Sequence, residues 1–313
     1  MRRSLLTLVL LLALALVAAG CGQDGARSDA AAPAAQGAAF PVTLDTPAGK
    51  LTLDQRPTRI VSMSPTATEM LFAVGAGSQV VAVDSNSNYP KEAPKTDLSA
   101  YQPNIESIAG YKPDLVVYSD DPGELAAGLS KLGIPAMKEP AAKSLDDTYA
   151  QLDQLGRATG HTAEAAKLVA TMRAEIAKIV AAGRPERPLT YYHELDKNLY
   201  SATSKTFIGQ LYSLLGMENI ADAADRQKSG YPQLSAEYVV KADPDLIFLA
   251  DTKCCDQSAR TVAARDGWDQ ITAVKSGGVV ELDDDVASRW GPRVVDFLKT
   301  ISAKANTLEA VGS

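Results

Sequence analysis

An internal repeat is the feature that most constrains how this chain can fold. Residues 105–118 read IESIAGYKPDLVVY and residues 236–249 read AEYVVKADPDLIFL, an ungapped match. In each copy a short amphipathic helix, with Asn104 or Ser235 as its N-cap, ends before a proline and leads into a continuously apolar strand. Such strands are typical of sheets covered by helices on both faces. The repeat therefore predicts an α/β fold of two similar lobes, each with a parallel sheet.

Two helices are predicted between the lobes, at about 145–158 and 163–182. The second has an apolar stripe and is followed by Gly183 and Pro185, which are typical of a helix end. Twenty helical residues span roughly 30 Å. One long backbone helix would thus join the lobes stiffly, with a ligand cleft between them. We expect an N-terminal lobe over 40–144, inter-lobe helices over 145–183 and a C-terminal lobe over 184–313.

The first residues are typical of a secretory signal peptide. A basic start precedes an apolar run over 4–17, which is too short to span a bilayer. The run ends in Ala-Ala-Gly before Cys21, which resembles the lipobox of bacterial lipoproteins; a secreted protein with a chance cysteine is the alternative. We expect a signal peptide over 1–20, a lipid on Cys21 and a flexible tether over 21–39. The predicted location is extracytoplasmic: the lipid alone would anchor the chain to the outer face of the cell membrane, or the chain would be periplasmic.

Composition excludes several classes of function. The chain is 46% hydrophobic and 22% charged, as in folded globular proteins, and its net charge of −7 argues against nucleic-acid binding. No Walker loop, nucleophile elbow or glycine fingerprint follows a predicted strand. The acidic groups Asp120–Asp121 and Asp283–Asp285 fit a cation site or an acid and base pair, but turns also need polar residues there. We therefore expect no enzyme activity.

Two adjacent cysteines, Cys254 and Cys255, remain in the expected mature domain. In an oxidising compartment they can form a vicinal disulfide, remain free thiols or bond to another chain. A vicinal disulfide, the option we favour, would make a rigid loop tip. No histidine or second cysteine pair is close in sequence, so no metal site is expected.

Six segments occur together in the chain: RIVSMSPTATEMLFAVGAG (59–77), NYPKEAP (88–94), the two PDL strands, SLLGMENI (213–220) and YPQLSAE (231–237). Together they resemble class III substrate-binding lipoproteins of bacterial ABC importers, which capture cobalamin, ferric siderophores or haem. The likeness covers about residues 57–302. It implies a monomeric receptor with no intrinsic cofactor, which passes a metal-chelate ligand to a permease and its ATPase. A lipid-anchored sensor with the same fold is a less favoured alternative.

The resemblance also implies roles for two glutamates. In this family a glutamate on each lobe docks onto permease arginines, and the residues matched here are Glu69 in SPTATEM and Glu218 in GMENI. Carboxylates on rigid helices can form charge-assisted pairs that fix orientation. Without the resemblance, both would be interpreted as solvated surface charges.

For the ligand, the resemblance favours a corrinoid. It matches four tyrosines to aromatic contacts around the ring, and aromatic side chains suit a large flat macrocycle. Arg289 and Trp290 match a loop that reaches the cleft; Arg289 would meet a polar or anionic ligand edge, or else form an ion pair with Asp283, Asp284 or Asp285. His193 is a weaker candidate ligand for haem iron or cobalt. The four tyrosines are Tyr89, Tyr101, Tyr200 and Tyr231.

Overall fold

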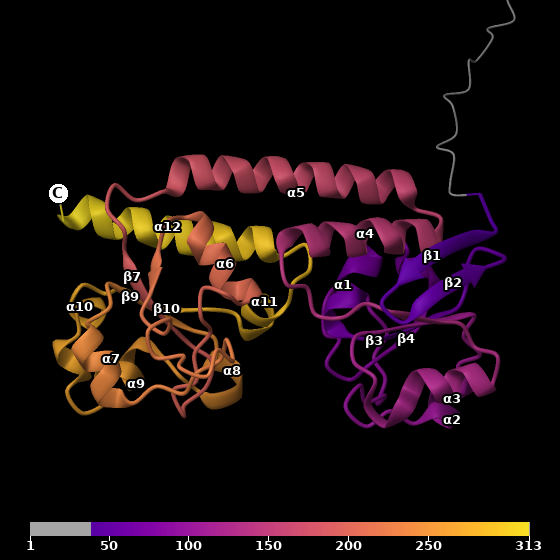
Figure 1. The fold of residues 1–313 in the computed structure, drawn as a ribbon, viewed down its shortest axis with the longest axis horizontal. Coiled ribbons are helices and arrows are strands. Elements are labelled where there is room, and N and C mark those ends of the chain that lie inside the picture. Colours follow the sequence, from indigo (N-terminus) through magenta and orange to yellow (C-terminus); the bar gives the residue numbers. More distant parts are fainter. Residues whose placement is uncertain (1–38, 313) are drawn as a thin grey trace, which may run out of the picture. The chain divides into compact units, whose positions relative to one another are not determined.

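The computed structural model describes residues 39–312 (Figure 1). The described residues belong to one compact unit. The predicted signal peptide, the lipidation of Cys21 and all of the predicted tether except residue 39 lie outside the described residues. Among those described, no helix combines the length and the apolar character needed to cross a membrane.

The N-terminal lobe is built on a four-stranded parallel sheet with the order β4-β3-β5-β6. Its strands are β3 (Ile60–Met63), β4 (Val80–Val83), β5 (Leu115–Tyr118) and β6 (Ala136–Lys138). Its helices are α1 (Pro65–Ala73), α2 (Ile105–Gly110) and α3 (Leu125–Lys131), with 3₁₀ turns at Gly77–Gln79 and Pro122–Glu124. An antiparallel hairpin of β1 (Val42–Thr46) and β2 (Gly49–Leu53) precedes the sheet.

The C-terminal lobe repeats this topology, with the order β10-β9-β7-β8 and all strands parallel. Its strands are β7 (Thr190–Glu194), β8 (Glu218–Asn219), β9 (Leu246–Leu249) and β10 (Val279–Glu281). Its helices are α6 (Phe207–Leu214), α7 (Ala236–Ala242), α8 (Thr252–Cys255), α9 (Ala259–Ala263), α10 (Thr272–Lys275) and α11 (Asp284–Ser288), with a 3₁₀ turn at Trp268–Gln270. When the four strands of each sheet are counted in chain order, both sheets have the spatial order second, first, third, fourth. The predicted pair of similar parallel lobes is confirmed.

Side-chain caps explain why the repeat helices begin where the sequence predicts. The Asn104 side chain accepts a hydrogen bond from the Ser107 backbone N–H at 2.8 Å, and the Ser235 hydroxyl accepts one from Tyr238 at 3.1 Å. Each satisfies one of the free N–H groups at a helix start.

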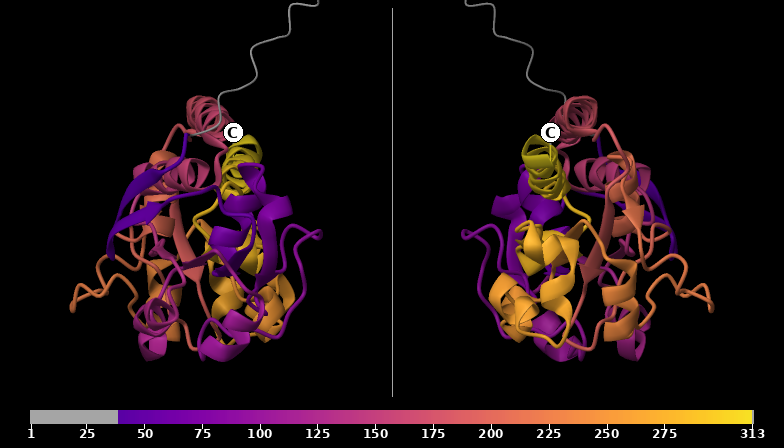
Figure 2. Two further views of the ribbon diagram at one scale, coloured as in Figure 1. Left: turned by 90° about the vertical axis from the view of Figure 1, so that its right-hand side faces the viewer. Right: turned by 90° about the vertical axis from the view of Figure 1, so that its left-hand side faces the viewer.

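Three helices form the backbone between the lobes: α4 (Leu145–Thr159), α5 (Thr162–Gly183) and the C-terminal α12 (Val294–Gly312). Figures 1 and 2 show α12 running alongside α5. Helix α12 falls within the residues predicted for the C-terminal lobe. Its buried residues Phe297, Leu298 and Ile301 share a core with α5 and with Tyr212 of α6.

Candidate ligand-binding site

The loops that follow β3, β4 and β5 meet at one edge of the N-terminal sheet. Carboxyl ends of parallel strands commonly form ligand sites, and here the loops line a cavity of about 670 Å³. Ser64 follows β3, Asn86 follows β4 and Ser119 follows β5; the Ser119 hydroxyl donates to the Ser64 hydroxyl at 2.7 Å. Asp84 is buried there, and burial raises its pKa. Hydroxyl and amide groups thus dominate this wall.

The segment after α11 forms the opposite wall of the cavity with Arg289 and Trp290. The Trp290 indole N–H donates to Gln151 of α4 at 2.9 Å, and its carbonyl accepts from the Thr148 hydroxyl at 2.9 Å. The cavity therefore lies between the N-terminal lobe and the chain that enters α12.

Arg289 is not free to act as a cation toward a ligand in this conformation. Its guanidinium lies 2.8 Å from Glu69 and 2.7 Å from Asp285, and its side chain is 8% exposed. It also donates to the Asn88 side chain at 3.0 Å. Of the three aspartates proposed as alternative ion-pair partners of Arg289, Asp285 is the one that pairs with it. Glu69 is a second partner, which the sequence spacing did not indicate.

Glu69 is buried, which does not fit a docking surface. Its side chain is 1% exposed, and its carboxylate also accepts from Arg293 Nε at 2.9 Å. Nearby, Arg293 Cζ lies 4.3 Å from the centre of the Tyr89 ring. A carboxylate held by two guanidinium groups cannot meet a partner without leaving this cluster. We define Glu69, Arg289 and Arg293 as the inter-lobe ion cluster.

The four predicted tyrosines are all exposed, and two of them line different hollows. Tyr101, 78% exposed, lines the cavity described above. Tyr89 lines a separate hollow beside Arg293. Tyr200 and Tyr231 belong to two C-terminal-lobe loops that are bridged antiparallel through Tyr200 and Gln233. Tyr200 and Tyr231 thus lie on neighbouring loops of the C-terminal lobe, whereas Tyr101 and Tyr89 line two different hollows.

Glu218 is exposed, and in the parallel pairing of β7 with β8 it lies opposite Thr190, the first residue of β7. It therefore lies at the amino edge of the C-terminal sheet.

Glu106 and Glu237 lie in the first turns of α2 and α7, and both are exposed. These two glutamates occupy equivalent positions in the repeated segments 105–118 and 236–249. Figure 1 shows α2 and α7 at the ends of the lobes opposite α5.

His193 does not reach the cleft, contrary to the alternative haem or cobalt role. It is fully buried, and its Nδ1 lies 2.9 Å from the Tyr212 hydroxyl. Burial lowers the pKa of His193 to about 4. Within residues 39–312, no group of three or more histidine, cysteine or acidic side chains is placed to hold a metal ion.

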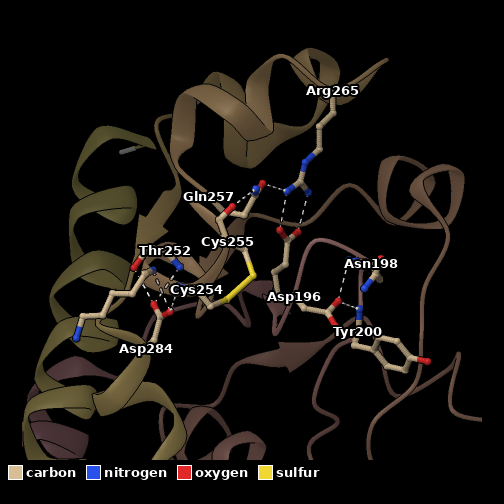
Figure 3. Close-up of a disulfide and its surroundings, with 11 residues drawn as sticks. Asp196, Asn198, Tyr200, Thr252, Cys254, Cys255, Gln257, Arg265 and Asp284 are labelled. Carbon is tan, nitrogen blue, oxygen red and sulfur yellow. Dashed lines mark hydrogen bonds and ion pairs between the residues drawn. A yellow bond between two sulfur atoms is a disulfide. The ribbon is translucent and has the colours of Figure 1, made fainter. Parts of the chain in front are cut away.

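Cys254 and Cys255 are joined by a disulfide in α8, at the carboxyl end of β9 (Figure 3). In Figure 3 the disulfide is flanked by Asp284 on one side and by the loop that carries Asp196 and Tyr200 on the other. The Asp284 carboxylate accepts hydrogen bonds from three successive backbone N–H groups of this turn, at 2.9 to 3.0 Å.

A buried acidic pair lies behind this loop. Glu194 forms a two-pronged ion pair with Arg265, at 2.6 and 2.7 Å, and is fully buried. Asp251 is also fully buried, and its burial and the nearby Glu194 raise its pKa to about 7. The pair belongs to the interior of the C-terminal lobe.

Fold and cavity together define a two-lobed α/β binding protein with a helical backbone. The family model described as "Periplasmic binding protein" matches residues 60–286, and the chain belongs to this family. It is accordingly a binding protein of the kind that serves ABC importers, and not an enzyme.

Two relatives and one solved structure illustrate the similarity. An uncharacterized ABC transporter substrate-binding lipoprotein of Bacillus subtilis is 30% identical over 303 residues, which cover 93% of this chain and 94% of that protein. A cobalamin-binding protein of Halobacterium salinarum is 34% identical over 277 residues, covering 85% and 74%. The crystal structure of a periplasmic vitamin B12-binding protein of Vibrio cholerae has a TM-score of 0.66 at 25% identity, covering 81% of this chain and 98% of that one.

Proposed function

We propose that this chain is a lipid-anchored, extracytoplasmic receptor that captures a corrinoid such as cobalamin and delivers it to an ABC permease. The observation that carries the choice of ligand is the charge of the cavity wall. Arg289 is the only basic residue among the lining residues, and two carboxylates already neutralise it. The remaining lining is largely hydroxyl, amide and aromatic, which suits the neutral amide groups around a corrin ring.

The same charge argument disfavours the alternative ligands, ferric siderophores and haem. Catecholate siderophores and haem propionates carry several negative charges, and burying an unpaired charge is costly. The carboxylates of Asp84, Asp120 and Asp285 around the cavity add to that cost. The name of the similar Halobacterium protein supports the corrinoid independently.

Calorimetric titration of residues 36–313 tests the ligand. We expect saturable binding of cyanocobalamin and none of haemin or ferric catecholates. Replacing Tyr101 with alanine should weaken binding by about 1–3 kcal/mol, the value of burying an aromatic side chain against a ligand. Leu132→Ala is the matched control, because Leu132 is 55% exposed in the same lobe and does not line the cavity. Binding of haemin or a ferric siderophore in place of cobalamin would transfer the proposal to iron uptake.

For docking to the permease we propose the exposed pair Glu106 and Glu237. The repeat gives them equivalent places at the start of α2 and α7, so one two-fold arrangement of permease arginines can meet both. Glu69 is less suited, because the inter-lobe ion cluster already holds its carboxylate. Glu218 remains the competing exposed candidate from the family resemblance.

Charge reversal separates the two candidates. A chain with Glu106→Arg and Glu237→Arg should bind ligand with unchanged affinity but lose uptake in cells that express the cognate permease and ATPase. Glu218→Arg is the matched control and should leave uptake intact. Loss of uptake in the control, with the double variant active, would shift docking to Glu218.

A further inference from the structure

The turn that contains the disulfide is too short to be stable by itself. Helix α8 is a single turn of four residues, and its N-cap residue Asp251 forms no side-chain capping bond. A single isolated turn is unfavourable in water, because ordering its residues is repaid by few hydrogen bonds. Its residues 252–255 are held by the covalent bond between Cys254 and Cys255 and by polar contacts, chief among them those to the Asp284 carboxylate. The Thr252 hydroxyl also donates to the Leu282 carbonyl at 2.9 Å.

Contacts lead from this turn to the wall of the ligand cavity. Besides the three backbone bonds to Asp284, the Thr252 hydroxyl donates to the same carboxylate at 2.8 Å. Lys253 Nζ lies 2.9 Å from both Asp283 and Asp285. The turn thus contacts three consecutive residues at the start of α11, and α11 leads directly to the cavity residue Arg289.

Asp285 then connects the turn to the opposite lobe. Its carboxylate lies 2.7 Å from Arg289 and accepts a hydrogen bond from the Asn88 side chain at 3.0 Å. Arg289 pairs with Glu69 at 2.8 Å. A change in the turn therefore reaches the cavity wall and the inter-lobe ion cluster through an unbroken series of short polar contacts.

The internal repeat gives independent support for this location. The strand β9 that precedes the turn corresponds to β5, and the loop after β5 contributes Ser119, Asp120 and Pro122 to the cavity lining. The disulfide turn is thus the C-terminal-lobe counterpart of a loop that lines the cavity. Cys254 is exposed, so a soluble reductant can reach it.

We propose that the Cys254–Cys255 disulfide is a positioning element of the ligand cavity, so that its reduction lowers ligand affinity. The disulfide holds the turn against Asp284 and thereby keeps Asp285 and Arg289 in place. In the reduction, a dithiol gives up two electrons and two protons and becomes a disulfide, while the Cys254–Cys255 bond breaks to two thiols. The effect on affinity rests on the proposed function, whereas the effect on α11 does not.

The first test needs no ligand. Residues 36–313 are compared in the oxidised state and after treatment with dithiothreitol, with amide hydrogen exchange as the readout. Exchange should accelerate in residues 252–255 and also in 284–290, and air reoxidation should reverse both changes. The Cys254→Ser, Cys255→Ser double variant should match the reduced protein. Acceleration confined to 252–255 would overturn the proposal.

The second test measures affinity for cyanocobalamin by calorimetry after the dithiothreitol has been removed under anaerobic conditions. Reduction should weaken binding about fivefold or more, within the usual range of coupling between sites. Asp284→Asn should weaken binding similarly, and reduction of that variant should have little further effect, because both changes break the same connection. Equal effects of reduction with and without Asp284→Asn would overturn the proposal. If the oxidised protein does not bind cobalamin, the proposed ligand fails, and the exchange experiment still decides the coupling.

Discussion

Glu69 illustrates how much the surroundings of one residue decide. On a predicted helix after a serine cap, it resembles any solvated glutamate. In the folded chain its carboxylate pairs with both Arg289 and Arg293, and the three side chains are 1%, 8% and 16% exposed. Buried charges at this level of exposure depend strongly on their partners, because removing one partner leaves the others uncompensated.

Replacing Glu69 with glutamine should therefore be costly. The substitution keeps the shape but removes the charge, and we expect a loss of about 3–5 kcal/mol in the free energy of unfolding, measured with urea. Glu106→Gln is the control and should change stability by less than about 0.5 kcal/mol, because its side chain is exposed. Similar results for the two variants would contradict the stabilising role of the inter-lobe ion cluster.

Glu139 predicts a pH dependence of stability. It is 3% exposed, its Oε1 has no hydrogen-bond partner, and burial raises its pKa from 4.5 to about 8. Between these values the folded state keeps a proton that the unfolded state has lost, so stability falls as pH rises. The slope is at most about 1.4 kcal/mol per pH unit for one group.

Urea unfolding of the wild type and Glu139→Gln at pH 6 and pH 8 isolates this contribution. The wild type should lose stability relative to the variant at pH 8, because glutamine cannot ionise. Other titrating groups, including His193 and Asp251, are common to both proteins, and their contributions cancel in the difference. If the stabilities of the two proteins changed in parallel with pH, the pKa of Glu139 would be the same in the folded and unfolded states, which contradicts the prediction.

At the scale of elements, α4 and α5 approach so closely that only glycine fits between them. A Cβ atom built at Gly156 of α4 would lie 2.4 Å from the Ala165 Cβ of α5 and 3.0 Å from the His161 carbonyl oxygen. The periodicity of the sequence predicts both helices but carries no information about this separation.

Gly156→Ala should therefore destabilise the chain by about 1–3 kcal/mol through overpacking, measured as the shift in urea unfolding. Gly110→Ala is the matched control at the end of α2, where a Cβ would meet nothing within 4 Å. That change should be neutral or slightly stabilising, because alanine is the better helix former. Equal effects at both positions would indicate that α4 and α5 can move apart freely.

For the whole molecule, one buried core joins the lobes to the helical backbone. It includes Ile60 and Leu115 of the N-terminal sheet, Phe248 of the C-terminal sheet and Ile301 of α12. A shared core couples the unfolding of its parts, so we expect a single cooperative transition. Urea unfolding followed by far-ultraviolet circular dichroism should coincide with unfolding followed by tryptophan emission, which reports on Trp268 and Trp290 in the C-terminal part. Two separated transitions would show that the lobes unfold independently.

Local patterns determined the elements and their class. The repeated helix–proline–strand segments, the caps at Asn104 and Ser235 and the apolar stripe of α5 depend on neighbours within a few residues, so they are readable from the chain alone. They were sufficient to predict two parallel lobes, a backbone helix and membership in a family of binding proteins.

Only the tertiary structure decided which side chains meet. Glu69 and Arg293 are far apart in the sequence and in contact in space, and Tyr89 stacks on that arginine instead of lining the cavity with Tyr101. Such contacts depend on how lobes and helices pack, which is set by the shape of the whole core and not by any local pattern. The sequence by itself therefore determined what kind of protein this is, and the packing of the lobes decided which of its residues are free to bind.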